Sequence, residues 1–219
     1  MVRAEPHRDA FLRALVERDS AAARRVVDAA LEEGLDVDDI YTGVMQPALY
    51  EIGHRWALGE LNVAQEHYAT TVAQSLLDVL SASRQRPPPD GRLALVTATP
   101  DEQHSLGARM LADFLEADGW ETLLLGAGPP MRDVLELVDL EQPDVVALST
   151  STAAVLPGLI ELVRALAELR PRPLILAGGR FWTAETTAAA REFGADLVIH
   201  DARAAVAALR ERVPPQAGS

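Results

Sequence analysis

The 219-residue sequence contains no cysteine, and all of its 20 basic residues are arginines. Without cysteine the chain cannot form disulfides, thiolate metal sites, iron–sulfur clusters or a thioether bond to a chromophore. Without lysine it lacks the amine nitrogen that P-loops and Schiff-base enzymes use. No apolar run approaches 18 residues, and the start has no signal-peptide core, so we expect a cytoplasmic protein that does not bind membranes. The net charge of −13 argues against direct binding to nucleic acid.

Residues 1–83 predict a four-helix bundle, because apolar residues recur there with the i, i+3, i+4 spacing of amphipathic helices. We expect Ser20 to cap the second helix and Pro47 to kink the third. Asn62, with Gln65 three residues later, predicts a capping box at the start of the fourth helix. The first half of the chain is therefore expected to form a helical domain.

A proline-rich segment separates this bundle from the rest of the chain. Three consecutive prolines within residues 84–91 favour an extended, stiff linker. A second domain is expected over residues 92–213, followed by a disordered tail, Pro214–Ser219.

The second half alternates short apolar runs with helix-like stretches, which predicts parallel strands covered on both faces. The runs are Leu93–Val96, Leu123–Leu125, Val145–Leu148, Leu174–Ala177 and Leu197–Ile199. Five strands in this space favour a flavodoxin-like, doubly wound parallel sheet with the order 2-1-3-4-5. The fold class is therefore α + α/β, and a ligand is expected at the carboxyl ends of the strands, at the switch point between strands 1 and 3.

The loop after the first strand carries Glu102, His104, Ser105 and Gly107. A carboxylate two residues before a histidine can accept one ring N–H and make the other nitrogen a better metal donor. The plainer alternative is a loop histidine that caps the following helix. A single histidine cannot hold a free ion, but it can supply one axial ligand to a metal held by a macrocycle.

The spacing of this loop to two later segments carries a family resemblance. E-x-H-x-x-G at 102–107 is followed after 41 residues by Ser149-Thr150-Ser151, and after 26 more by Gly178-Gly179. This pattern resembles the D-x-H-x-x-G, S-x-L, G-G signature of cobalamin-binding domains. The sequence departs from that signature at Glu102, where most members have Asp, and at Ser151, where the pattern has Leu.

The resemblance implies a role for each matching position. His104 would bind cobalt as the lower axial ligand, and Glu102 would orient it. Ser149 or Ser151 would offer a hydroxyl to the benzimidazole of the cofactor. Gly178 and Gly179 would let the nucleotide tail approach the backbone closely.

The bundle carries a second resemblance. Trp56, nine intervening residues and then Glu66-His67 resemble the W-x9-E-H motif of the CarH/LitR cobalamin photoreceptors, which place a four-helix bundle over adenosylcobalamin. This implies that Trp56 covers the adenosyl group, Val63 lines its pocket and Glu66 forms a hydrogen bond with it. The alternative is that Trp56 belongs to the bundle core and Glu66 only favours its helix N-terminus.

Two departures from the photoreceptors bear on mechanism. We expect no DNA-binding domain, because no room for one precedes the bundle. Ala57 stands where the best-understood members have a cobalt-binding histidine, which leaves water or His67 as the upper ligand after illumination. His54 is expected to point away from Trp56, and His7 and His200 are interpreted as surface residues.

These observations favour an adenosylcobalamin-dependent light sensor that signals through an unknown protein partner or through its own oligomeric state, without enzymatic turnover. The alternative is a corrinoid protein that carries methyl groups in a methyltransferase system, and a storage module is a third hypothesis. A mutase is disfavoured, because the sequence has no substrate barrel. A second, non-covalent chromophore such as a bilin is compatible with the absence of cysteine, although no residue points to one.

Overall fold

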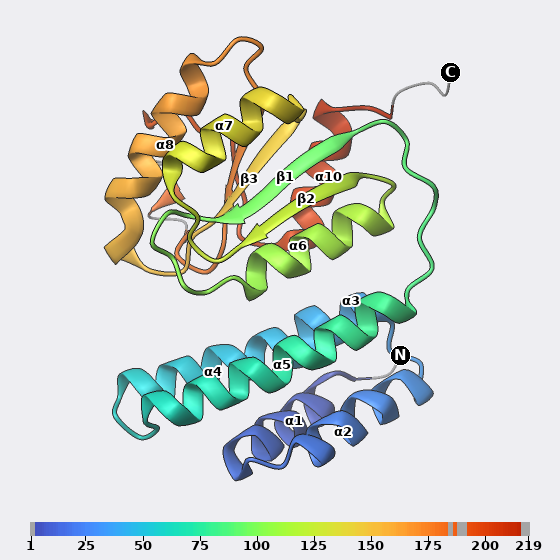
Figure 1. The fold of residues 1–219 in the computed structure, drawn as a ribbon. Helices are drawn as coiled ribbons and strands as arrows, with labels where there is room; N and C mark the ends of the chain where they lie inside the picture. The colour runs from blue at the N-terminus through green and yellow to red at the C-terminus, as the bar shows by residue number, and fades with distance from the viewer. Residues whose placement is uncertain (1–2, 184–185, 188–191, 216–219) are drawn as a thin grey trace. The chain divides into compact units, whose positions relative to one another are not determined.

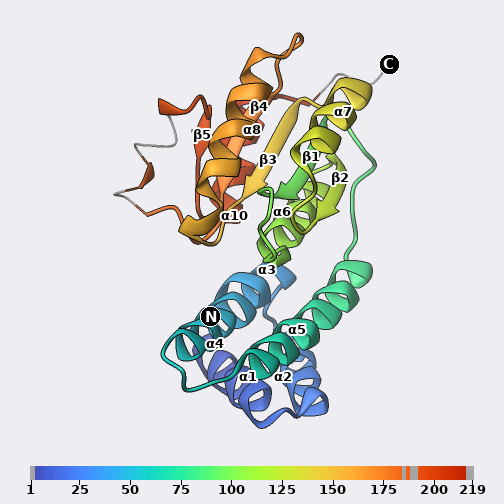
Figure 2. The same ribbon diagram turned by 60° about the vertical axis from the view of Figure 1, so that its left-hand side comes forward.

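The computed structural model describes residues 3–183, 186–187 and 192–215. The chain divides between Arg84 and Gln85 into two compact units, one helical and one built around a sheet. Each unit is described by itself, and Figures 1 and 2 show the elements of both.

The helical unit is built from amphipathic helices joined by short turns. They are α1 (Glu5–Glu17), α2 (Ser20–Glu32), α3 (Val37–Asp39), the π-helix η1 (Ile40–Met45), α4 (Gln46–Ala57) and α5 (Val63–Ser83). Asp19, rather than Ser20, caps α2, because its carboxylate accepts the N–H of Ala22 at 2.8 Å. The capping box that Asn62 and Gln65 predict for α5 is present.

The expected third helix runs from α3 through η1 to α4, and a π-helical segment directly precedes the turn that contains Pro47. Pro47 has no N–H to donate to the carbonyl of Gly43, and its ring would crowd that carbonyl in a regular α-helix. The preceding turn is wider, and the N–H of Gln46 donates to the carbonyl of Tyr41, five residues back. The wider turn therefore accommodates the proline within the helix.

Apolar side chains fill the interior of the helical unit. The largest fully buried ones are Tyr41, Phe11, Leu15, Ile40, Met45, Ile52, Leu77 and Leu80. The hydroxyl of Tyr41 donates to the carbonyl of Leu77 at 3.2 Å, so even the polar atom of this core is paired. His7 is buried rather than on the surface, and its Nε2 lies 3.2 Å from a carboxylate oxygen of Glu33, which caps the end of α2. His200 is exposed, as expected.

The second unit contains five parallel strands among the described residues, in the order β2-β1-β3-β4-β5. The strands are β1 (Leu93–Ala98), β2 (Glu121–Gly126), β3 (Val145–Ser149), β4 (Leu174–Gly178) and β5 (Leu197–Val198). This order confirms the doubly wound sheet and the switch point between β1 and β3. In the register of the sheet, Ser149 lies between Ala98 and Gly178, so the three strands that carry the sequence motifs end at the same level.

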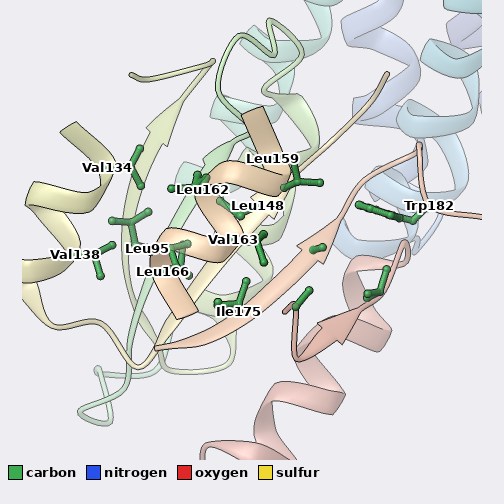
Figure 3. Packing of buried hydrophobic residues seen from close by; sticks show 14 residues of the cluster. Leu95, Val134, Val138, Leu148, Leu159, Leu162, Val163, Leu166, Ile175 and Trp182 are labelled. Atoms are coloured by element: carbon green, nitrogen blue, oxygen red, sulfur yellow. The ribbon is translucent and has the colours of Figure 1, made fainter. Parts of the chain in front are cut away.

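Helices cover both faces of this sheet (Figure 1). The helical elements are α6 (Leu106–Ala117), α7 (Met131–Glu141), the short 3-10 helix η2 (Ala153–Val155), α8 (Leu156–Glu168) and α10 (Ala202–Arg212). α7 and α8 lie over one face, and α6 and α10 lie over the other. Figure 3 shows the core on the α7 and α8 side, where Leu95, Leu148 and Ile175 of the strands pack against aliphatic side chains of those two helices.

The proline-rich linker between the two units also packs on the sheet unit. Arg86 lies 2.5 Å from the buried carboxylate of Asp113 on α6, and the backbone N–H of Asp90 donates to the carbonyl of Gly119 at 2.9 Å. Of the expected tail, Pro214 and Pro215 have no regular structure, and residues 216–219 lie outside the described residues. Among the described residues, every helix is too short or too polar to span a membrane.

Candidate functional site

Three loops meet at the carboxyl edge of the sheet, following β1, β3 and β4. The N–H of Thr99 donates to the carbonyl of Ser149 at 3.0 Å, and the N–H of Thr150 donates to the carbonyl of Gly178 at 2.8 Å. The hydroxyls of Thr99 and Thr150, both fully buried, lie 2.8 Å apart. The three segments of the sequence motif therefore form one hydrogen-bonded structure at the switch point, which is where doubly wound sheets bind ligands.

Glu102 is the buried acid of this edge, with only 2% of its side chain exposed. One carboxylate oxygen accepts the backbone N–H of His104 at 3.0 Å and lies 2.5 Å from Nδ1 of the same residue. The other oxygen accepts the backbone N–H of Ser151 at 2.9 Å. Burial by itself would raise the pKa of Glu102, but these hydrogen bonds outweigh it and hold the pKa below its usual value. Glu102 thus remains a carboxylate that ties the β1 loop to the β3 loop.

His104 presents its imidazole at the surface of this edge, with 49% of the side chain exposed. Because Nδ1 is bonded to Glu102, the tautomer with its proton on Nδ1 carries the metal-binding lone pair on Nε2. Ser105, rather than His104, occupies the N-cap position of α6, and the Ser105 side chain does not make the capping hydrogen bond. In this arrangement Nε2 can be offered to a metal while Glu102 holds the ring.

The glycines of the motif allow the loops themselves to approach closely. A Cβ on Gly107 would lie 3.1 Å from the hydroxyl oxygen of Ser149. Gly179 has φ of +103°, and a Cβ there would lie 2.3 Å from the carbonyl oxygen of Thr150. Gly178 would meet the carbonyl of Ile199 at 3.1 Å. In the structure these glycines therefore serve backbone packing, in addition to the role toward a cofactor that the resemblance implies.

The structure brings to this edge several residues that the sequence analysis did not identify. The paired hydroxyls of Thr99 and Thr150 are one example, and threonines at the carboxyl ends of two buried strands could have indicated them. Gly128, in the loop after β2, is another, because a Cβ there would lie 3.0 Å from the backbone nitrogen of Asp101. Ser151 contributes its backbone N–H, whereas the expectation concerned its hydroxyl.

In the helical unit, Trp56 is not a core residue. Ala48 and Ile52 are buried on the same stripe of α4, but Trp56, one turn further on, is 45% exposed. Val63, at the start of α5, and Leu58, in the connecting turn, are also exposed. The apolar stripe of α4 therefore continues beyond the part of the bundle that covers it.

Glu66 and His67 lie in the first turn of α5. The carboxylate of Glu66, 15% exposed, accepts the hydroxyl of Thr70 at 2.9 Å and lies 2.6 Å from Nδ1 of His67. The imidazole of His67 is 73% exposed. Ala57 and His54 are exposed on α4. Trp56 thus lies near the end of α4, and Glu66 and His67 lie at the start of α5.

Comparison with known families identifies this architecture. Residues 92–210, more than half of the chain, match a family described as "B12 binding domain", and residues 7–81 match a second family of the same description. The chain belongs to the B12-binding domain family.

Curated relatives include two groups. The chain is 29% identical over 177 residues to the HTH-type transcriptional repressor CarH of Myxococcus xanthus, a match that covers 80% of this chain and 58% of the repressor. It is 25% identical over 203 residues to the trimethylamine corrinoid protein of Methanosarcina barkeri, covering 90% of this chain and 92% of that protein. The chain therefore spans less than two thirds of the repressor's length.

Among solved structures, the monomethylamine corrinoid protein of Methanosarcina barkeri superposes with a TM-score of 0.78 at 20% identity. The match covers 95% of this chain and 99% of that one, and it supports the fold assignment.

The residues at the carboxyl edge fit a corrinoid. The donor set is a single half-exposed imidazole with a buried carboxylate behind it, which suits one axial ligand of a metal whose macrocycle supplies the rest. A buried polar atom at the same edge, the indole nitrogen of Trp182, lacks a hydrogen-bond partner among the described residues. The donor set and this unpaired donor are both compatible with a cobalamin.

Proposed function

We propose that this protein is an adenosylcobalamin-dependent light sensor. In this proposal His104, oriented by Glu102, would supply a ligand to cobalt, and Trp56, Val63 and Glu66 would contact the adenosyl group. When bound, adenosylcobalamin supplies a cobalt–carbon bond that light can break. The observation that carries the proposal is Trp56, an indole left 45% exposed at the end of an otherwise buried stripe, ten positions before a nearly buried carboxylate.

The exposed indole favours a large, partly polar upper group. A half-exposed Trp leaves apolar surface in water, and covering that surface is favourable at roughly 25 cal/mol per Å². The Glu66 carboxylate, held by Thr70 and His67, is an acceptor for hydroxyl or amino groups. A nucleoside has both an aromatic face and such donors, whereas a methyl group has neither.

Output is expected to pass through protein surfaces. Losing the adenosyl group would uncover Trp56 and Val63 and leave the Glu66 carboxylate without that partner. Each change alters what the helical unit exposes. With a net charge of −13, the receiving surface is expected to belong to a protein or to another copy of this chain rather than to nucleic acid.

A second candidate is a corrinoid protein that carries methyl groups. The match to the trimethylamine corrinoid protein favours it, because that match spans almost the whole of both chains. In such a carrier, Trp56 and Glu66 would not distinguish between upper ligands.

The two candidates differ in one experiment. The full chain is loaded in the dark with adenosylcobalamin or with methylcobalamin, and absorption and size-exclusion profiles are recorded before and after green light. A sensor shows a light-dependent change of elution or shape that requires the adenosyl form. A carrier binds both forms equally well and elutes identically before and after light, which would refute the proposal. Absorption at longer wavelengths than those of cobalamin would reveal a bilin in the same samples.

A further inference from the structure

Two buried tryptophans in the sheet unit have indole N–H groups without a hydrogen-bond partner among the described residues: Trp120 and Trp182. A buried donor that is left unpaired is unfavourable, so each case requires a physical explanation. The two residues lie at opposite edges of the sheet, and their surroundings differ.

Trp120 immediately precedes β2, at the amino edge. The guanidinium of Arg92 lies over its ring, 4.5 Å from the centroid, and Arg92 is itself paired with the carboxylates of Asp90 and Asp118. The ring is thus engaged through its face in a cation–π contact. This contact does not pair the Trp120 N–H, but Trp120 lies at the amino edge, away from the edge where doubly wound sheets bind ligands.

Trp182 follows β4, at the carboxyl edge, and is only 3% exposed. Its backbone N–H donates to the carbonyl of Gly179 at 3.3 Å, and the N–H of Phe181 donates to the carbonyl of Thr150 at 3.2 Å. Through Thr150 and its neighbour Ser151, this turn is connected to the Glu102 carboxylate. Figure 3 shows the Trp182 ring beyond the end of the strand that carries Ile175, at the margin of the aliphatic cluster.

Nothing within the described protein explains the Trp182 donor. Phe181 meets the indole edge-on, with centroids 5.1 Å apart and planes at 78°, which is an apolar contact. A ligand that enters this edge with a hydrogen-bond acceptor would pair the N–H. The nucleotide tail of a cobalamin carries such acceptors on its phosphate, its ribose and its benzimidazole.

We propose that Trp182 is a specificity-determining residue whose indole N–H donates to the nucleotide tail of the bound cobalamin. Trp182 thereby selects complete cobalamins over corrinoids that lack the tail. This inference rests on the cobalamin site of the proposed function but not on its light response.

The test measures binding in the dark, with hydroxocobalamin as the complete ligand and cobinamide as the ligand without a tail. Trp182→Phe retains an aromatic ring but removes the donor. We expect its affinity for hydroxocobalamin to fall about 5- to 100-fold, because an acceptor loses its partner in a buried site. Its affinity for cobinamide should change by less than about twofold. Trp120→Phe is the matched control and should not discriminate between the two ligands.

Two further measurements keep the test decisive if Trp182→Phe folds poorly or cobinamide binds weakly. Replacing Trp182 by benzothienylalanine, in which sulfur takes the place of the N–H, removes the donor at nearly constant volume. In the parent chain with ¹⁵N-labelled tryptophan, the Trp182 indole resonance should shift downfield when hydroxocobalamin binds. Equal losses for both corrinoids, no loss for either, or an unshifted indole resonance would each overturn the proposal. A chain that passes this test but ignores light would refute the sensor alone.

Discussion

The two units each place a glutamate beside a histidine, but the pairs are built differently. Glu102 is buried, and it joins two loops through the backbone N–H groups of His104 and Ser151. Glu66 lies in the first turn of α5, and its carboxylate contacts the side chains of Thr70 and His67. The first pair is fixed by the architecture of the sheet edge, whereas the second can rearrange by rotating side chains.

This difference indicates which pair is permanent and which is responsive. A carboxylate held by backbone donors keeps its geometry whether or not a ligand is present, as a metal-orienting residue requires. A carboxylate held by side chains of its own helix can exchange these partners for a ligand group through side-chain rotation. We therefore expect substitutions at the first pair to affect binding of every cobalamin, and substitutions around the second to affect only the adenosyl form.

The largest effect is expected for His104→Ala. It removes the imidazole that binds cobalt, so the affinity for adenosyl-, methyl- and hydroxocobalamin should fall by about 100-fold or more. Spectral titration measures the affinity, and the visible spectrum should lose the features of a histidine-bound cobalt. Parent-like affinity and spectrum in this variant would exclude His104 as the ligand.

Glu102→Gln should have the next largest effect, about 10- to 100-fold on all three cobalamins, because it weakens the support of His104 while preserving the shape of the side chain. Glu66→Gln is its matched control and should affect the adenosyl form alone.

The Glu102 pair also predicts a pH dependence of stability. The folded protein holds the pKa of Glu102 below its ordinary value of about 4.3. The stabilisation is therefore fully present above that pH and is lost as the pH falls through the lower, folded pKa. In urea unfolding of the sheet unit between pH 6 and pH 3, Glu102→Gln should flatten the acid side of the curve. An acid limb identical to that of the parent would contradict this assignment.

Trp56→Ala should produce a smaller but selective effect. Loss of an indole packed on a nucleoside is expected to weaken adenosylcobalamin about tenfold or more and to leave methylcobalamin nearly unchanged. Tyr50→Ala, another exposed aromatic on α4, is the control and should change neither affinity. An equal loss of affinity for both cobalamins would indicate that Trp56 has a structural role instead.

The smallest effect in the dark is expected for His67→Ala. The imidazole is 73% exposed, and Thr70 still holds the Glu66 carboxylate, so dark affinity should stay within about twofold. Spectra after illumination then separate the two upper ligands left open by Ala57. Parent and variant should match if water fills the site, and they should differ if His67 does.

The fold and the pairing of Glu102 with His104 could be predicted from the sequence, because both leave local signals. Apolar runs separated by helical stretches indicate a parallel sheet, and the spacing of Glu102, Ser149 and Gly178 places three loops at one edge. Contacts made through backbone atoms of distant loops leave no such signal, which is why the Ser151 N–H was missed. The burial of His7 leaves no local signal either, because its partner, Glu33, lies 26 residues away at the end of α2.

The π-helical segment Ile40–Met45 sets the directions in which the side chains of α4 point, because it precedes them on the same helix. One residue more or less in a helix rotates the positions after it by about 100°. Ala48, Ile52 and Trp56 share one stripe because they are four residues apart within α4, and the wider turn before them sets the direction of that stripe relative to the residues that precede it. Deleting one residue so that a regular α-turn forms there would rotate Trp56 by about 100° around the helix axis, although none of the proposed binding residues would change. The number of residues between Ile40 and Trp56 therefore fixes the direction in which Trp56 points as well as its position along the helix.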